Sequence, residues 1–419
     1  MVEIIDSISK YNLWGGNSPF LGFNRHIYQE KVLKSVGNSL VKVVVGQRRV
    51  GKSFVLRQIL SKIVAGGVPA ENTLYINKEF LEFSAIKSAE DLQSLYAAYK
   101  SRFSPQGKTY LFIDEIQYID GWERFVNARS QDFAEPCEVF ISGSNSDILS
   151  GELSTMLSGR YVRFEVFPYS FGEFCELTGK PQDASSFTDY VQHGALPELF
   201  NLDSEEMRRN YVESLKDSVM LRDVVQRYRI KDATLLNDLF VFLSNNASNL
   251  ISFTNVVKSL KGQGRKTNYE TVSTYAGYLE NAFLIHSCPR FNIRGKDSLS
   301  GPAKYYMNDF SFHNYLYAGF GYGMGYLFEN AIYLELRRRG YDVYVGELDG
   351  SEVDFVAIRN DARIYIQVAY KMDGESTIAR EYAPLEKIRD SYPKFVVSLD
   401  EFRLPSNNGI LHVRPWEIP

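Results

Sequence analysis

The sequence is poor in cysteine and histidine. Its 419 residues include 3 cysteines, far apart at Cys137, Cys175 and Cys288, and 5 histidines that stand alone. Zinc sites use closely spaced cysteines and histidines, and disulfide frameworks use paired cysteines. No such spacing is present, so we expect all of these residues to pack in the core or to lie on the surface.

Long apolar runs and an excess of one charge are also missing. No stretch approaches the roughly 20 apolar residues that cross a bilayer, and Met1–Asp6 lacks the basic-then-apolar order of a signal peptide. We therefore expect a cytoplasmic protein with no membrane partner. The 47 basic and 51 acidic residues leave a net charge of −4, so any surface that attracts nucleic acid must be local. The length predicts about three domains.

The sequence does contain a phosphate-binding loop between a strand and a helix. Gly46–Ser53 follows the apolar run Val41–Val45 and precedes the amphipathic run Phe54–Ile63. Glycines let backbone N–H groups curl around a phosphate, and the following helix points its positive end at the same anion. The lysine then reaches the β- and γ-phosphates, and the serine hydroxyl holds Mg²⁺. The order of strand, loop and helix disfavours a merely structural turn. The predicted nucleotide-binding residues are Gly46, Gln47, Arg48, Arg49, Val50, Gly51, Lys52 and Ser53.

Two acidic residues end another apolar strand. Tyr110–Ile113 is followed by Asp114 and Glu115, and the carboxyl ends of strands in an open α/β sheet lie where ligands bind. An aspartate in this position supports Mg²⁺ in P-loop enzymes. We therefore assign Asp114 as a Mg²⁺ ligand beside Ser53, and Glu115 as the catalytic base that activates water. The alternative for Asp114 is a helix N-cap.

Three further runs predict strands in the first part of the chain, at Thr73–Asn77, Glu138–Ser142 and Tyr161–Val166. Helical stretches such as Ala89–Lys100 and Trp122–Arg129 separate most of the strands. The pattern predicts an α/β fold with a doubly wound parallel sheet of about five strands. The strand that ends in Asp-Glu comes third along the chain, which is typical of P-loop proteins with a catalytic glutamate and an extra strand inserted in the sheet.

Two more segments offer groups to the γ-phosphate. The fourth strand leads into Ser142–Asn145, and we predict that Ser144 or Asn145 orients the attacking water, with an ordinary turn as the alternative. Arg160 is the best candidate for a cation that stabilises the transferred phosphoryl group. The alternative for Arg160 is a surface arginine that packs its stem.

Four motifs together resemble those of a family of bacterial and archaeal AAA+-like ATPases. With h for an apolar residue, the family order is GxRRxGKS/T, hhhhDEhQ, hhhSGSxS and LxGRxxxhxhxPhSFxEF, and the matching residues are 46–53, 110–117, 139–146 and 157–174. Gln47 stands where a proline is more usual. The resemblance covers essentially the whole chain. It implies a P-loop ATPase that uses ATP and Mg²⁺, followed by a winged-helix module and by a domain that resembles a restriction-endonuclease fold.

The middle of the chain predicts three helices and a hairpin, which is the order of a winged helix. The helices are expected at Leu235–Asn245, at Phe253–Leu260 and after a capping box at Thr267–Glu270, and the hairpin strands at Phe283–Pro289 and Lys304–Asn308. The basic residues around the third helix and the wing are Lys258, Lys261, Arg265, Lys266, Arg290, Arg294, Lys296 and Lys304. They favour non-specific DNA contact at most, because the third helix has no arginine or lysine to read a base. A lid or dimerisation unit is the alternative.

The last part of the chain resembles an endonuclease-like core that lacks part of its catalytic set. That core uses a helical Glu, a strand Asp and a Glu-x-Lys on the next strand to hold metal and activate water. Glu329 and Asp354 match, whereas Gln367 and Ala369 replace the acid and the lysine. Lys371 lies on the same strand face but about 6.6 Å further along. We favour a retained fold with lost or weak nuclease chemistry.

These expectations divide the chain into an AAA+-like ATPase domain at 1–195, a helical lid or linker at 196–230, a winged-helix domain at 231–312 and a degenerate endonuclease-like domain at 313–419. We expect Mg²⁺-dependent binding of ATP and its hydrolysis to ADP, driving rearrangement of the C-terminal domains. An ATP-dependent DNA nuclease and a nucleotide-gated DNA-binding regulator are the alternatives. Whether Arg160 acts within its own subunit or across an interface of a homo-oligomer stays open. Tyr11–Asn24 either folds over the adenine or forms a surface arm.

Overall fold

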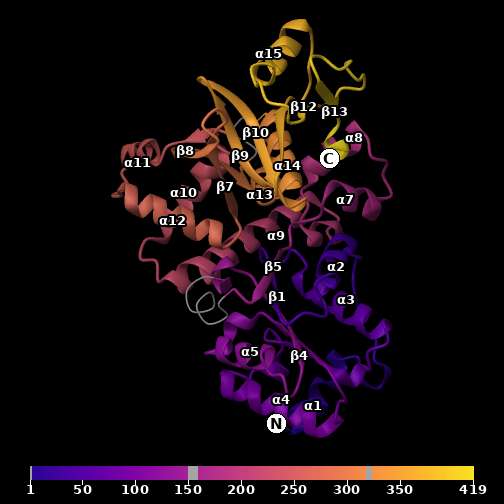
Figure 1. Ribbon diagram of the computed structural model, residues 1–419. Helices are drawn as coiled ribbons and strands as arrows, with labels where there is room; N and C mark the ends of the chain where they lie inside the picture. The colour runs from indigo at the N-terminus through magenta and orange to yellow at the C-terminus, as the bar shows by residue number, and fades with distance from the viewer. Residues whose placement is uncertain (1, 150–158, 318–322) are drawn as a thin grey trace. The chain divides into compact units, whose positions relative to one another are not determined.

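The structure is a computed structural model that describes residues 2–149, 159–317 and 323–419 (Figure 1). The chain forms two compact units, Met1–Val166 and Phe167–Pro419. This division falls at residue 166, whereas the sequence suggested residue 195 as the end of the ATPase domain. Among the described residues, no helix is both long enough and apolar enough to cross a membrane.

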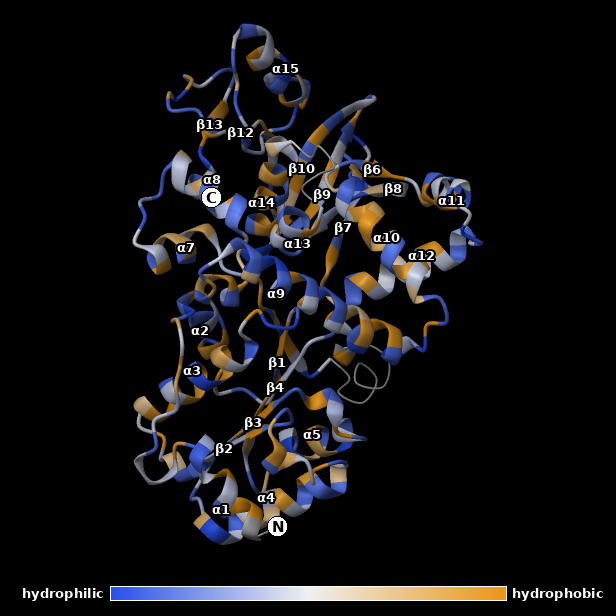
Figure 2. Cartoon of the chain, turned by 180° about the vertical axis from the view of Figure 1, so that it is seen from behind, coloured by the Kyte–Doolittle hydropathy of each residue, from blue (hydrophilic) through white to orange (hydrophobic). Residues whose placement is uncertain are grey.

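The first unit is built on a parallel sheet of five strands in the order β2-β3-β4-β1-β5. The strands are β1 (Val41–Val45), β2 (Thr73–Asn77), β3 (Thr109–Asp114), β4 (Cys137–Gly143) and β5 (Tyr161–Glu165). Every residue of β1, β2 and β4 is buried, which explains their nearly continuous apolar runs. Figure 2 shows hydrophobic residues along β1 and β3. Because β4 lies between β1 and β3, the sheet confirms the predicted inserted strand.

Helices and short 3₁₀ turns connect these strands. They are α1 (Val2–Ile8), η1 (Ser9–Tyr11), η2 (Trp14–Gly16), α2 (His26–Leu33), α3 (Lys52–Ala65), η3 (Ala70–Asn72), η4 (Leu81–Phe83), α4 (Ala89–Phe103), η5 (Ile116–Tyr118), α5 (Trp122–Ser130) and η6 (Ser146–Leu149). α1 packs against α4, α4 against α5, and α2 against α3. Since all strands are parallel, the segments that follow β1, β3 and β4 leave the sheet at the same edge, and the predicted phosphate loop and acids lie there.

The second unit begins with helices. They are α7 (Phe171–Thr178), α8 (Ala184–His193), η7 (Pro197–Asn201), α9 (Glu205–Ser218) and the π-helix η8 (Val219–Gln226). α7 starts at a capping box in which Ser170 and Glu173 satisfy each other's backbone N–H groups. This part of the chain includes the segment expected to be a helical lid or linker, and it is helical as expected.

A buried aspartate fastens the end of α8. Gly194 has a φ of +86°, and an added Cβ would lie 2.8 Å from the Ser311 Cβ. The next residue, Ala195, donates its N–H to the Asp309 carboxylate at 2.9 Å. Burial raises the pKa of Asp309 to about 6, although hydrogen bonds from Ser311 and Ala195 and the charge of Arg338 act in the opposite direction. This clasp ties residues 194–195 to the start of α13 (Ser311–Leu316).

Three helices and a hairpin follow, in the predicted order. They are α10 (Ala233–Asn245), α11 (Phe253–Gly262), α12 (Tyr269–Asn281), β7 (Ile285–Asn292) and β8 (Asp297–Met307), with the short strand β6 (Leu250–Ile251) paired to β8. The predicted capping box at Thr267 is wrong by one residue, because Asn268 caps α12 and accepts from the Thr271 N–H at 2.8 Å. The register of β7 and β8 shifts at Pro289, since proline has no N–H for the ladder.

The hairpin continues into a mixed sheet of eight strands in the order β13-β12-β11-β10-β9-β7-β8-β6. The later elements are α14 (Met324–Arg338), β9 (Asp342–Leu348), β10 (Ser351–Arg359), β11 (Ala362–Val368), α15 (Glu375–Glu386), β12 (Lys394–Val397), β13 (Ile410–Val413) and η10 (Pro415–Glu417). β7 pairs with β9 in parallel at residues 290–292. The sequence suggested a domain boundary at residue 312. The strands before this residue and the strands after it belong to the same sheet.

Candidate functional site

Glycines shape the loop between β1 and α3. Gly46 has a φ of +150° and Gly51 a φ of +98°, and Arg49 adopts a φ of +70° between them. A Cβ at Gly46 would lie 2.3 Å from the Val166 carbonyl oxygen, so the backbone approach itself requires glycine at this position. The result is a tight loop that leads directly into α3.

The start of α3 is suited to an anion. Its N-cap residue, Gly51, has no side chain that could satisfy the first N–H groups of the helix, and such groups together with the helix dipole bind phosphate. Lys52 is nearly buried, donates to the Gln47 carbonyl oxygen at 3.0 Å and lies 3.6 Å from Glu115 Oε1. The loop thus presents one cation beside its backbone donors, as the sequence predicts.

The side chains of the other predicted loop residues differ in their contacts and in their burial. Arg48 donates to Glu79 at 3.0 Å and to the Tyr118 hydroxyl at 2.9 Å, whereas the Arg49 side chain is exposed. Gln47 and Val50 are buried. Arg48 therefore ties the loop to the segments that follow β2 and β3.

Asp114 is fully buried at the end of β3 and is held by several hydrogen bonds. Its Oδ2 accepts from the Tyr75 hydroxyl at 2.8 Å and from the Asn77 amide at 3.0 Å, and its Oδ1 accepts from the Ser142 hydroxyl. Burial and the charge of Glu115 raise the pKa of Asp114, while hydrogen bonds from Ser142, Ser53 and Tyr75 lower it. The structure thus brings the serine of the loop and the aspartate of β3 together.

Glu115 follows in a left-handed conformation with a φ of +56°. Its N–H donates to Ser142 Oγ at 3.1 Å, and its Oε2 accepts from the Gln117 amide. Gln117 also donates to Ser144 Oγ at 3.3 Å. The sequence analysis assigned no role to Ser142 or Gln117. Gln117 could have been found, because it is the last residue of the motif that contains Asp114 and Glu115.

Asn145 is fully buried two residues after the end of β4. A Cβ at Gly143 would clash with the Ile148 side chain and lie 2.8 Å from Gln117 Oε1. The chain can therefore pass close to Gln117 only because residue 143 is a glycine. Through Ser144 and Gln117 this segment is connected to Glu115, which supports a role for residues 144–145 beside the acids.

The structure does not bring Arg160 to the loop of its own chain. The Arg160 carbonyl oxygen accepts from the Val41 N–H at 3.0 Å, and Val41 pairs with Tyr161 at the start of both strands. The loop follows Val45, so the two places are separated by the length of β1, about 13 Å at 3.3 Å per residue. The Arg160 side chain is exposed at that opposite edge. Residues 157 and 158 of the same motif lie outside the described residues.

A segment before β1 also contacts the loop, which sequence reasoning missed. Arg25 is buried and donates to the Val50 carbonyl oxygen at 3.1 Å. Gln58 of α3 donates to the carbonyl oxygens of Leu21 and Phe23, both at 2.7 Å, and accepts from the Arg25 N–H at 3.1 Å. Residues 21–25 are thus fastened to α3 beside the loop. The expectation that Tyr11–Asn24 covers the adenine stays a prediction.

In the second unit, Glu329 and Asp354 lie together as expected, but the cation beside them is unexpected. Lys304 of β8 contacts Glu329, Glu352 and Asp354. Lys371, the lysine considered from the sequence, is exposed. Lys304 could not be found from spacing because it lies in a distant hairpin strand.

Burial dominates the electrostatics of this cluster. It raises the pKa of Asp354 to about 7, with the charge of Glu329 acting in the same direction and that of Lys304 against it. Burial also raises the pKa of Glu329, against the charge of Lys304. Burial alone would lower the pKa of Lys304, but the charges of the three acids outweigh it and raise that pKa.

The Gln367 side chain makes hydrogen bonds to two neighbouring residues. Its amide donates to Glu381 Oε2 at 3.2 Å, and its Oε1 accepts from the Asp354 N–H at 3.4 Å. Within residues 2–149, 159–317 and 323–419, no group of three or more His, Cys, Asp or Glu side chains is placed to hold a metal ion. The endonuclease-like residues are thus assembled without a metal-binding arrangement.

Half of the predicted basic patch is engaged with acids. Lys304 is buried in the cluster above, Arg265 pairs with Asp238, and Arg294 pairs with Asp349. Arg290 lies 3.8 Å from a carboxylate oxygen of Glu347. The charge that this face offers to a phosphate backbone is therefore smaller than the residue types suggest.

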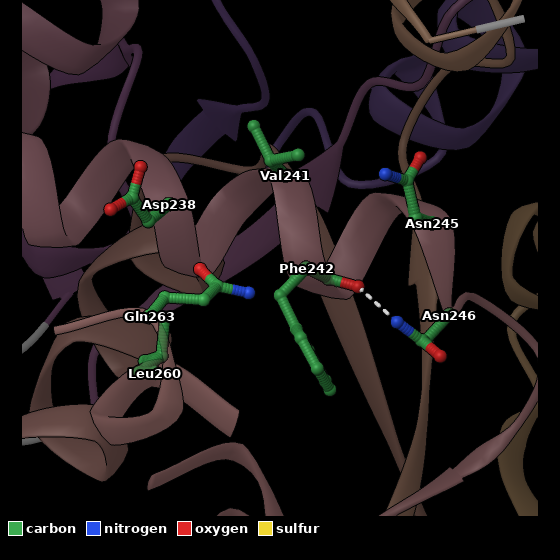
Figure 3. Close-up of a pocket in the computed structure, with 7 residues that line it drawn as sticks. All are labelled: Asp238, Val241, Phe242, Asn245, Asn246, Leu260 and Gln263. Carbon is green, nitrogen blue, oxygen red and sulfur yellow. Dashed lines mark hydrogen bonds between the residues drawn. The ribbon is translucent and has the colours of Figure 1, made fainter. Parts of the chain in front are cut away.

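A pocket of about 240 Å³ lies between α10 and α11 (Figure 3). It is lined by Asp238, Val241, Phe242, Asn245, Asn246, Leu260 and Gln263. Asn246 donates to the Phe242 carbonyl oxygen at 2.8 Å, and the Asp238 carboxylate accepts a hydrogen bond from Arg265. Its lining contains no predicted site residue.

The inserted strand, the loop after β1 and the acids after β3 define a P-loop ATPase domain of the AAA type. In agreement, a family model described as "AAA domain" matches residues 38–175, and one described as "Domain of unknown function (DUF8612)" matches residues 184–321.

Two relatives are similar over most of their length. An uncharacterised protein of Haemophilus influenzae is 34% identical over 401 residues, which are 94% of this chain and 98% of that protein. The uncharacterised protein MJ1544 of Methanocaldococcus jannaschii is 30% identical over 362 residues, 83% of this chain and 78% of that protein. The chain belongs to the same protein family as these two.

Among solved structures, the Walker-type ATPase PABY2304 of Pyrococcus abyssi is similar with a TM-score of 0.47 and 15% identity, covering 70% of this chain and 95% of that chain.

Proposed function

We propose that the first unit binds ATP with Mg²⁺ and hydrolyses it to ADP. The observation that carries the proposal is the meeting of Lys52, Ser53, Asp114 and Glu115, which come from the loop, from α3 and from the end of β3. Lys52 and the N–H groups at the start of α3 bind the β- and γ-phosphates. The side chains are already positioned by hydrogen bonds, so little reorganisation is needed.

The donor set at this edge fits Mg²⁺. A serine hydroxyl and an aspartate carboxylate are hard oxygen ligands, and Mg²⁺ is usually held by one or two protein groups together with phosphate and water. Ser53 and Asp114 would hold the ion, which when bound neutralises charge on the phosphates. The hydrogen bonds from Tyr75 and Asn77 to Asp114 Oδ2 keep the other carboxylate oxygen, Oδ1, on the Ser142 side.

Glu115 accepts the proton of the attacking water in this proposal. Gln117 and Lys52 restrict its carboxylate, and Ser142 fixes its backbone N–H. Asn145 or Ser144 orients the water from the end of β4. The burial of Glu115 supports these roles, because it keeps bulk water away from the base.

The test is Glu115→Gln. It should bind ATP as the wild type does and hydrolyse it about 10²- to 10⁴-fold more slowly, since this is the usual effect of a general base. ATP affinity and kcat are measured separately, by titration and by steady-state turnover. Glu90→Gln is the matched control, because Glu90 is an exposed carboxylate on α4. Unchanged turnover in Glu115→Gln would refute the assignment.

We propose that Arg160 acts across an interface between two copies of the chain. Its position at the opposite edge of the sheet supports this option over action on its own loop. The test mixes Arg160→Ala with Glu115→Gln, each inactive alone. Recovery of ATPase activity on mixing supports action in trans, because a mixed oligomer contains an intact loop facing an intact arginine. Absence of recovery, with a monomeric protein at assay concentration, contradicts it.

We further propose that α10–α12 with β7 and β8 form a winged-helix module, that α14 with β9–β11 form an endonuclease-like core without nuclease activity, and that ATP turnover rearranges this second unit. The order of the elements supports the first two assignments. Limited proteolysis of the full chain with ATP and with ADP tests the third, with Lys52→Ala as the control that should show no difference between nucleotides.

Non-specific DNA contact through this module belongs to the same proposal, and the lysines at 258, 261, 266 and 296 would carry it. Reversing the charge of Lys266 and Lys296 should weaken binding of any DNA sequence alike. A gel-shift assay at two salt concentrations measures this. Binding that is unaffected by both reversals would remove DNA contact from the proposal.

A further inference from the structure

Lys304 is buried among three carboxylates of the second unit. Its Nζ lies 2.9 Å from Glu329 Oε1, 2.8 Å from Glu352 Oε1 and 3.6 Å from Asp354 Oδ1. Only 4% of the lysine side chain is exposed, and a buried ammonium persists only where its charge is compensated. The acids belong to α14 and β10 and the lysine to β8, so the cluster joins three elements.

The ammonium stands at the point toward which the three carboxylates face. Lysine has three N–H donors, and here two reach carboxylate oxygens at hydrogen-bond distance while the third acid lies at ion-pair distance. A divalent cation held by the same oxygens would sit about 2.0–2.6 Å from each of them. It could not share that position with the lysine, because like charges at such short range repel strongly.

Neighbouring groups hold the acids in place without a metal. The Tyr306 hydroxyl donates to Glu329 Oε1 at 2.7 Å, and the Val368 N–H donates to Asp354 Oδ2 at 2.8 Å. Glu352 is the most exposed of the three, with 40% of its side chain accessible. The cluster therefore reaches solvent on the side of Glu352, and a small ion could enter there if the lysine were absent.

We propose that Lys304 is an internal cation that takes the place of a divalent metal ion in this acid cluster. It excludes metal from Glu329, Glu352 and Asp354 and fastens β8 to β10 and α14. When the ammonium is removed, the three carboxylates lose the charge that compensates them, and a divalent cation could then supply that charge once the side chains adjust around it. The proposal is independent of the ATPase site, since all of its residues lie in the second unit.

The test uses the full chain without nucleotide and Mn²⁺ alone as the probe. Lys304→Met keeps the length of the side chain and removes its charge. We expect Lys304→Met to bind Mn²⁺ at least about 10-fold more tightly than the wild type, and the added Asp354→Asn substitution to abolish this gain. Lys371→Met, a change at an exposed lysine of the same unit, should leave Mn²⁺ binding as in the wild type.

Ser53 and Asp114 of the first unit also contribute to Mn²⁺ binding by the full chain. The first unit is unchanged in the Asp354→Asn variant, so comparing each protein with this variant removes that contribution. Wild-type Mn²⁺ binding that Asp354→Asn abolishes would overturn the proposal, since metal would then share the cluster with the lysine as in an active nuclease. Failure of folded Lys304→Met to gain Mn²⁺ binding would also overturn it. If Lys304→Met does not fold, Lys304→Arg keeps the charge and should bind Mn²⁺ no more tightly than the wild type. A gain in Mn²⁺ binding by Lys304→Arg that the added Asp354→Asn substitution abolishes would refute the idea.

Discussion

The clasp at Asp309 predicts a pH-dependent stability of the second unit. In the unfolded chain an aspartate titrates near its ordinary value of 3.8, whereas burial raises the pKa of Asp309 in the folded chain to about 6. Between these values the folded state binds more protons than the unfolded state, so stability falls as the pH rises. The stabilisation is full below pH 3.8 and lost above about pH 6. One pKa unit equals about 1.4 kcal/mol, so the total loss is about 3 kcal/mol.

The assay follows unfolding of the second unit in the full chain. The protein has 3 tryptophans, and Trp416 packs against Phe171 and Phe187 at ring distances of 5.4 and 6.3 Å. In a background with Trp14 and Trp122 changed to phenylalanine, Trp416 fluorescence reports urea unfolding of this unit. The unfolding free energy is measured at intervals from pH 4 to pH 7 in this background and in its Asp309→Asn variant.

Asparagine at position 309 cannot ionise, and the variant should be less stable overall because its amide cannot accept from both the Ala195 and the Ser311 N–H groups. The decisive quantity is the difference between the two proteins as a function of pH. It should decrease by most of the total of about 3 kcal/mol as the pH rises from 4 to about 6, and should change little between pH 6 and pH 7. Parallel curves over the whole range would show that Asp309 titrates normally and would refute the reasoning.

Two further predictions concern the first unit. Gly46→Ala should lower ATP affinity at least about 10-fold, because its Cβ would meet the Val166 carbonyl oxygen. Gly67 also has a positive φ, of +101°, but a Cβ there would have no atom within 4 Å, so Gly67→Ala should leave binding unchanged in the same titration. Equal effects of the two substitutions would contradict the contact. Ser142→Ala should lower kcat about 10-fold with little change in ATP affinity, because its hydroxyl links Asp114 to the Glu115 N–H, and a larger change in affinity than in kcat would contradict this role.

Much of the first unit could be predicted because its signals are local. The loop Gly46–Ser53, the strand before it and the helix after it are adjacent in sequence, and the Asp-Glu pair ends a strand with an obvious apolar run. The position of Arg160 in the fold, in contrast, does not depend on adjacent residues. It depends on the pairing of β5 with β1, which puts the residue before β5 beside the start of β1, and these two strands are far apart in the sequence.

The second unit was harder to predict because its interactions join distant segments. Lys304 was read as part of a basic surface, since an isolated lysine in a hairpin strand gives no sign that acids of α14 and β10 surround it. The continuous sheet depends on three residue pairs between β7 and β9. Such a short parallel pairing leaves no pattern in either strand.

The short pairing between β7 and β9 limits where the protein can be cut into fragments. A chain cut at residue 312 would leave the backbone amides and carbonyls of residues 290–292 without the partner strand β9, and an open strand edge invites association with other chains. Fragments meant to behave well should begin near residue 167 and run to the C-terminus, keeping all eight strands in one piece.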